Sequence, residues 1–126
     1  MDWRRRLLWI DGAGGAVVGV LTLALGSWWA RWTGLPYEHV LLMAGANLGY
    51  GAYSLTLASR RVRPLPLIGL LVLANGTWGV LCGVWLVRFA GQVTPLGWLH
   101  LGGEGLYVGG LAALEWRWRT LLTRAG

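Results

Sequence analysis

Three polar side chains recur on one face of the last apolar stretch of this sequence. His100, Glu104 and Tyr107 are separated by four and then three residues, a spacing that places side chains on the same face of an α-helix. An imidazole, a carboxyl group and a phenol on one face could bind a cation or pass a proton. Glu104 is the centre of this hypothesis, because no other Asp, Glu, Lys or Arg occurs between Arg88 and Glu115.

A carboxylate in the middle of a membrane costs on the order of 3 kcal/mol, so an intramembrane Glu is a functional-site hypothesis by default. Asn47 and Asn75 lie in two other apolar stretches, and Tyr50 shares a helical face with Asn47. We therefore predict a polar pocket in which Glu104 is the acid and His100 passes protons outward. The predicted ligand or proton site consists of Glu104, Asn47, Asn75, Tyr50, Tyr107 and His100.

The same polar groups have a purely structural interpretation. A protonated Glu and two Asn can hydrogen-bond across helices, at about 0.6 kcal/mol for each bond on average. The other two acidic residues of the apolar stretches also have simple explanations. Asp11 lies near Arg4, Arg5 and Arg6 and would pair with them or match the helix dipole. Glu115 continues the face of Glu104 and would pair with Arg117 and Arg119.

The elements that must position these groups are membrane helices. The chain has 126 residues, a mean hydropathy of +0.53 and only 13% charged residues. A spanning helix needs about 20 apolar residues, and we predict four of them, approximately over residues 7–29, 39–59, 67–87 and 96–116. The fold class is therefore all-α, a four-helix transmembrane bundle forming one domain over residues 1–126. Short loops make consecutive helices antiparallel neighbours.

The arginines indicate the orientation of the bundle. Arg31 and Arg88 fall on one side of a four-span topology, and the other nine arginines fall on the opposite side. This asymmetry places both termini in the cytoplasm. It also accounts for the formal charge of +6, so we expect no nucleic-acid partner. The segment from Arg4 to Leu8 resembles the start of a signal peptide, but Asp11 and the glycines break its apolar core, and we expect it to remain as the first helix.

The chain contains 21 glycines. Small residues four apart let membrane helices approach closely, and each predicted helix has such a pair: Gly15 and Gly19, Gly45 and Gly49, Gly79 and Gly83, Gly105 and Gly109. A tight bundle, a homo-oligomer or both are expected. A two-hairpin internal repeat is a further interpretation, because a shift of 57 residues places Asn47 on Glu104 and Tyr50 on Tyr107.

No catalytic motif is present, so we predict no catalytic residues and expect that the chain is not an enzyme. Cys82 is single and no Cys/His metal-ligand spacing occurs, so no metal site and no cofactor are predicted. One alternative remains for His39 and His100. Two facing histidines in a four-helix bundle could ligate haem, which would make the chain a redox protein.

Several short patterns resemble those of a group of small bacterial four-helix integral membrane proteins. They are Asp11 to Gly14, Gly34 to Pro36, Ala74 with Asn75, and the series Leu96, Gly97, Glu104, Leu111, Ala112 and Glu115. That group has no established activity, so the resemblance implies a fold and a multi-pass location in the bacterial inner (plasma) membrane.

The predicted function is to bind or transport a small ligand or proton in the lipid bilayer, as an oligomer. The alternatives are a non-catalytic accessory or scaffolding membrane subunit and the haem-binding redox protein.

Overall fold

A computed structural model describes residues 2–125 of the chain, and within this range every long element is a helix. Met1 and Gly126, which belong to the predicted domain, lie outside the described residues. The elements, in chain order, are η1 (Trp3–Arg6), α1 (Leu7–Thr33), α2 (Tyr37–Ala58), α3 (Leu65–Arg88), α4 (Pro95–Arg117) and the short α5 (Arg119–Leu122).

The helix ends follow from local chemistry. Gly34 adopts a left-handed φ of 74° and ends α1, a backbone position that favours glycine. The Thr94 side chain accepts a hydrogen bond from the Gly97 backbone and caps α4, with Pro95 at its first position. Pro66 likewise lies in the first turn of α3. The helices begin within two residues of the predicted starts, and α1 ends four residues later than predicted.

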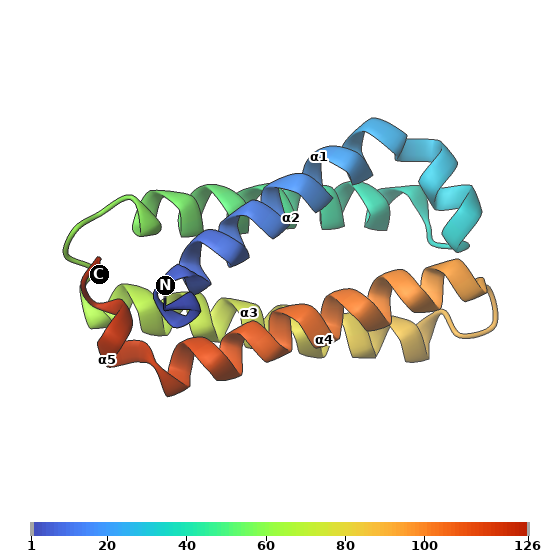
Figure 1. The fold of residues 1–126 in the computed structure, drawn as a ribbon. Coiled ribbons are helices and arrows are strands. Elements are labelled where there is room, and N and C mark those ends of the chain that lie inside the picture. The colour runs from blue at the N-terminus through green and yellow to red at the C-terminus, as the bar shows by residue number, and fades with distance from the viewer. Residues whose placement is uncertain (1, 126) are drawn as a thin grey trace.

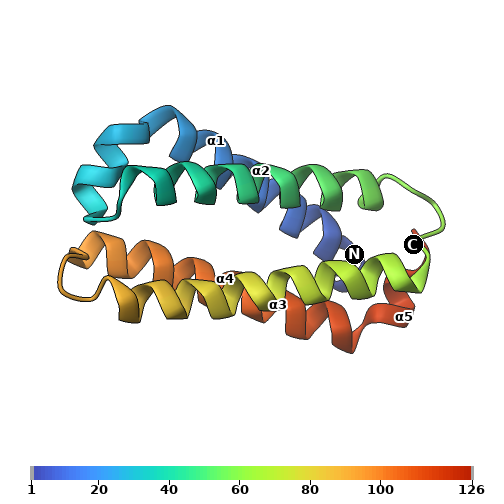
Figure 2. The ribbon, with the colours of Figure 1, turned by 180° about the vertical axis from the view of Figure 1, so that it is seen from behind.

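The four long helices form two antiparallel hairpins, α1 with α2 and α3 with α4 (Figures 1 and 2). The first hairpin is tight because its backbones nearly touch. A Cβ added at Gly15 would lie 2.9 Å from the Asn47 carbonyl oxygen, and one added at Gly51 would lie 2.7 Å from the Ala16 nitrogen. The expectation of antiparallel neighbours is thus confirmed within each hairpin, whereas α2 and α3 make little contact. In the first hairpin small residues provide the close approach.

Helix α1 is broken at Gly26, whose φ of 43° and ψ of −113° are not helical. Figure 1 shows α1 bending before the turn into α2. The positive φ favours glycine, because a Cβ there would be strained. The break lies three residues before Trp29 and so changes the direction in which that indole is presented to the rest of the bundle.

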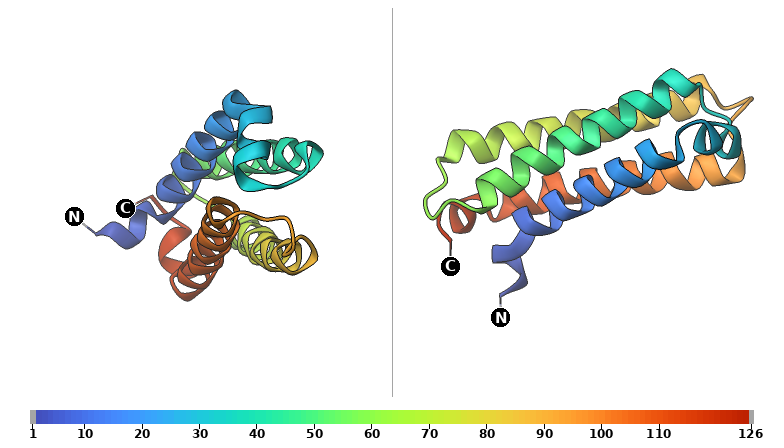
Figure 3. Two further views of the ribbon diagram at one scale, coloured as in Figure 1. Left: turned by 90° about the vertical axis from the view of Figure 1, so that its right-hand side faces the viewer. Right: turned by 90° about the horizontal axis from the view of Figure 1, so that it is seen from above.

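Both described chain ends and the α2–α3 loop lie at one end of the bundle (Figures 1 and 3). Arg63, in this loop, is 2% exposed. Its guanidinium donates hydrogen bonds to the carbonyls of Leu57, Ala58 and Leu122, at 3.1, 2.6 and 3.2 Å. Arg63 therefore ties the end of α2 to the C-terminal segment.

Buried hydrophobic side chains form two clusters, one near each end of the bundle. Met43, Trp78 and Leu101 belong to the cluster near the α1–α2 turn, and Leu8 and Ile68 belong to the cluster near the termini. Asn47 and Asn75 lie in the helix segments between these clusters, and Glu104 lies between Leu101 and Val108 of the first cluster. The middle of the bundle therefore contains a layer of buried polar side chains, which is called the polar layer below.

Three helical segments are long and apolar enough to cross a membrane: Trp3–Thr33, Tyr37–Ala58 and Leu65–Arg88. This supports the prediction of a membrane protein with transmembrane helices. Helix α4 is of similar length but contains His100, Glu104 and Glu115 in addition to several glycines, which lower its mean hydropathy.

Candidate functional site

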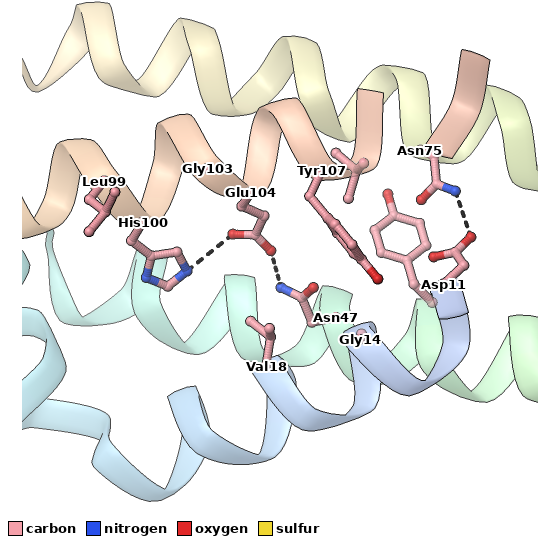
Figure 4. Close-up of a pocket in the computed structure, with 13 residues that line it drawn as sticks. Asp11, Gly14, Val18, Asn47, Asn75, Leu99, His100, Gly103, Glu104 and Tyr107 are labelled. Carbon is pink, nitrogen blue, oxygen red and sulfur yellow. Dashed lines mark hydrogen bonds and ion pairs between the residues drawn. The ribbon is translucent and has the colours of Figure 1, made fainter. Parts of the chain in front are cut away.

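Glu104 lies between an amide and an imidazole in the polar layer. Its Oε1 accepts a hydrogen bond from Asn47 Nδ2 of α2, and its Oε2 lies 3.2 Å from His100 Nε2, one turn earlier on α4. Asn47 Nδ2 also donates to the Met43 carbonyl at 2.9 Å, which orients the amide. Figure 4 shows the row of the three side chains. Both oxygens of the carboxyl group therefore face nitrogen atoms.

Trp29 determines which nitrogen of His100 can carry a hydrogen. The indole Nε1 donates to His100 Nδ1 at 2.6 Å, so Nδ1 must act as an acceptor. In a neutral imidazole the remaining hydrogen then resides on Nε2, which points at Glu104. Neither His100 Nε2 nor Glu104 Oε2 has a further hydrogen-bond partner among residues 2–125. The kinked end of α1 thus sets the direction of the contact between His100 and Glu104.

A second polar cluster lies nearer the termini and contains two carboxyl groups. Asn75 Nδ2 donates to Asp11 Oδ2 at 2.7 Å and to Glu115 Oε1 at 2.9 Å. All three side chains are almost inaccessible, with exposed fractions of 2% for Asp11 and 0% for Asn75 and Glu115. One amide from α3 therefore bridges a carboxyl group of α1 and a carboxyl group of α4.

This arrangement corrects the interpretation of Asp11 and Glu115 as partners of interfacial arginines. The two ion pairs found among residues 2–125 join Arg4 to Asp2 and His100 to Glu104, so neither buried carboxyl group pairs with an arginine. The physical reason is the helical phase. Asp11 lies one turn before Gly15, on the face that packs into the bundle, whereas the arginines lie at its end.

Both clusters contribute to the lining of one pocket of about 250 Å³, although Glu115 is not part of it. Asp11 lies toward one end, Glu104 and His100 toward the other, and Tyr107 lies between them (Figure 4). The rest of the lining comes from Gly14, Gly15, Val18, Asn47, Tyr50, Asn75, Leu99, Gly103 and Val108. Helices α1 and α4 contribute most of the wall, so the pocket lies along the junction between the two hairpins.

The six residues predicted for the site all line this pocket, but they do not form one group. Asn47 and His100 contact Glu104, whereas Asn75 contacts Asp11 and Glu115 instead. The hydroxyl groups of Tyr50 and Tyr107 donate to the backbone carbonyls of Ala74 and Ile10, at 3.0 and 2.9 Å. The tyrosines therefore join helices and leave their rings to face the pocket.

Sequence reasoning missed Asp11, Glu115 and Trp29 as members of the site. For Glu115 a signal existed, because it continues the face of Glu104 along α4. For Asp11 the spacing of four residues to Gly15, and again to Gly19, indicated a face in helix–helix contact. Nothing in the sequence indicated Trp29, because its approach to His100 depends on the break at Gly26.

The arrangement does not fit haem ligation by His39 and His100. Both His100 nitrogens face other side chains, and the His39 ring packs edge-on against Trp85 and Phe89, with centroid distances of 5.3 and 4.9 Å. Within residues 2–125, no three His, Cys, Asp or Glu side chains are grouped so as to hold a metal ion. Cys82 is buried and free.

No protein-family model, curated protein or solved structure matches this chain. The chemistry of the site must therefore be argued from its own residues.

Proposed function

We propose that this chain is an integral membrane protein whose pocket binds a small ligand, or a proton, at Glu104. In this proposal α4 is the fourth spanning helix, and the nine arginines at one end of the bundle place both termini in the bacterial cytoplasm. The resemblance to small bacterial four-helix membrane proteins supports the same location in the inner membrane. Helix α4 tolerates its polar groups because they face other helices, as intramembrane ionisable residues do.

The observation that carries the proposal is a carboxyl group on the wall of a cavity. Glu104 is 9% exposed, and it faces the same space of about 250 Å³ as Asp11 and two tyrosine rings. Polar groups that only hold helices together can be satisfied by one another without a cavity beside them. A pocket with a carboxyl group near each end and aromatic rings between suits a small organic cation, because carboxylates and ring faces both attract positive charge.

Proton binding would couple the site to the packing of α1. A proton on Glu104 Oε2 would meet the hydrogen on His100 Nε2, so the contact between them would be lost. His100 cannot relieve the conflict by moving its hydrogen to Nδ1, because Trp29 Nε1 donates there. Protonation would therefore force either His100 to turn or the kinked end of α1 to move, which is a route from a charge to a conformational change.

The proposal includes self-association. A Cβ added at Gly45 or Gly49 would have no atom within 4 Å, so this small-residue pair on α2 faces away from the bundle. Such a pair is a suitable surface for a helix of a second copy. The accessory or scaffolding alternative uses the same surface for another protein and assigns no ligand to Glu104.

Substitution of Glu104 distinguishes these possibilities. The full-length protein, purified in detergent, would be titrated at pH 6 and pH 8 with benzyltrimethylammonium, a small organic cation that serves as a probe. We expect Glu104→Gln to weaken binding by at least about tenfold, since a charged contact contributes more than about 1.5 kcal/mol. A difference between the two pH values would report competition between protons and the probe.

Glu38→Gln is the matched control, because it makes the same chemical change at an exposed position and should leave binding unchanged. Equal binding by wild type and Glu104→Gln would remove Glu104 from the site. If the protein binds no probe and Glu104→Gln alters neither its stability nor its response to pH, the scaffolding alternative becomes the better account. An absorbance spectrum without a Soret band would dispose of the haem alternative.

A further inference from the structure

Four polar side chains, one from each long helix, meet at the end of the pocket nearer the termini. Asp11 comes from α1, Ser54 from α2, Asn75 from α3 and Glu115 from α4. Ser54, Asn75 and Glu115 are 0% exposed and Asp11 is 2% exposed. The Ser54 hydroxyl and the Glu115 carboxyl group both lie beside Asp11 without forming a hydrogen bond to it. This group of four residues is called the four-helix cluster below.

The four-helix cluster has more oxygen acceptors than hydrogen-bond donors. Asn75 Nδ2 serves both carboxyl groups, while Ser54 Oγ, Asn75 Oδ1 and Glu115 Oε2 are buried without a hydrogen-bond partner among residues 2–125. Buried polar atoms are almost always paired in native proteins. Two unpaired acceptor oxygens and an unpaired hydroxyl in a cluster with two carboxyl groups therefore indicate that a proton or a cation belongs there.

No side chain among the described residues supplies that charge. Among residues 2–125, neither Asp11 nor Glu115 forms an ion pair with an arginine or a histidine. The two carboxyl oxygens lie less than about 6 Å apart, because both are within 3 Å of the same Asn75 nitrogen. Two bare carboxylates at that separation repel each other and are poorly solvated in a membrane.

We propose that the four-helix cluster binds a sodium ion, with protons competing for the same two carboxyl groups. Carboxylate, amide and hydroxyl oxygens are ligands that suit a hard cation. A transition metal is not favoured, because no imidazole or thiolate belongs to the cluster. One sodium ion and one proton together neutralise the two carboxylates. The ion would connect all four helices at once.

This inference goes beyond the function proposed for Glu104 and does not depend on it. Glu104 contacts Asn47 and His100 and makes no hydrogen bond to the four-helix cluster. A protein that fails to bind the organic probe at Glu104 can still bind sodium at Asp11 and Glu115. The converse also holds, so the two proposals can fail separately.

Thermal unfolding of the full-length protein in detergent tests the proposal. The midpoint Tm would be compared in sodium chloride and in choline chloride at equal ionic strength, at pH 6 and pH 8. An ion that binds only the folded state raises Tm. At a sodium concentration about a hundred times its Kd, we expect an increase of about 5 °C or more at pH 8. The increase should be smaller at pH 6, because protons compete.

Asp11→Asn and Glu115→Gln should each abolish the difference between sodium and choline. Asp2→Asn, just before the first spanning segment, and Glu38→Gln, at the exposed start of α2, make the same chemical changes away from the cluster and should preserve it. Asp2 is a suitable control because its hydrogen bonds with Arg4 lower the pKa of its carboxyl group from 3.8. Asp2 is therefore ionised throughout pH 6–8, and its removal introduces no pH dependence in that range.

Equal Tm values in sodium and choline at both pH values would overturn the proposal, and would mean that protons alone neutralise the carboxyl groups. A sodium effect that persists in Asp11→Asn would overturn it as well. If Asp11→Asn does not fold, Ser54→Ala tests the sodium site in its place. Loss of the hydroxyl should raise the sodium concentration needed for half of the Tm increase by about tenfold, and an unchanged sodium response would count against the site. Glu104→Gln should keep the sodium response.

Discussion

Replacing Arg63 tests whether one buried guanidinium holds the end of the bundle together. Arg63→Met keeps a long, flexible side chain but removes the donors to the carbonyls of Leu57, Ala58 and Leu122. The backbone nitrogen of residue 63 would still donate to the Thr123 carbonyl, at 2.7 Å. The substitution therefore isolates the side-chain contribution to the contact between α2 and the C-terminal segment.

The expected loss of stability is the difference between two opposing contributions. Hydrogen bonds to charged groups contribute about 1.5–3 kcal/mol each, so three of them together exceed the several kcal/mol needed to desolvate the guanidinium. Burial also lowers the pKa of Arg63 below its ordinary value, because desolvation disfavours the charged guanidinium. We expect a net loss of about 3 kcal/mol in the free energy of unfolding, equivalent to a fall in Tm of about 10 °C.

The assay is thermal unfolding in detergent, followed by size-exclusion chromatography of the protein that remains folded. Arg61→Met is the matched control, because Arg61 has an exposed side chain and its loss should change stability by less than about 0.5 kcal/mol. Arg63→Lys should fall between wild type and Arg63→Met, since an ammonium group cannot reach three carbonyls as a guanidinium does. Equal Tm values for Arg63→Met and Arg61→Met would refute the reasoning.

Two further predictions concern the helix contacts around the site. Gly15→Ala should destabilise the bundle by about 1–3 kcal/mol, because its methyl group would meet the Asn47 carbonyl oxygen at 2.9 Å. Gly45→Ala, with open space at that position, should be neutral or slightly stabilising in the same unfolding assay. Trp29→Phe removes the donor to His100 Nδ1 and should weaken probe binding while costing about 1 kcal/mol of stability. Unchanged probe binding would show that Trp29 does not orient His100 toward Glu104.

The sequence predicted the architecture well because membrane helices leave strong local signals. Uncharged runs of about twenty residues, bounded by arginines and prolines, predicted all four long helices to within a few residues. The kink in α1 was not predicted, because an isolated glycine within an apolar run is common in membrane helices and does not by itself indicate a break.

The candidate site was only partly predictable. Helical spacing correctly indicated that Glu104 and His100 share a face, because that relation is internal to one helix. The partner of Asn75 could not be read in this way, since it depends on how the two hairpins are rotated and shifted against each other. Sequence proximity to the arginines gave the wrong partners for Asp11 and Glu115, because residues near in sequence can face opposite directions on a helix.

By itself, then, the sequence determined the class of protein: its apolar runs require helices that satisfy their own backbone hydrogen bonds, and its arginines gather at one end. Only the tertiary structure decided that its buried polar residues form two clusters and not one. The reason is physical. Helical periodicity fixes the face of a helix on which a side chain lies. Which amide reaches a given carboxyl group depends instead on how the two hairpins pack against each other. Glycine contacts and the break at Gly26 determine that packing, and they act between residues too far apart in the sequence for a local pattern to predict.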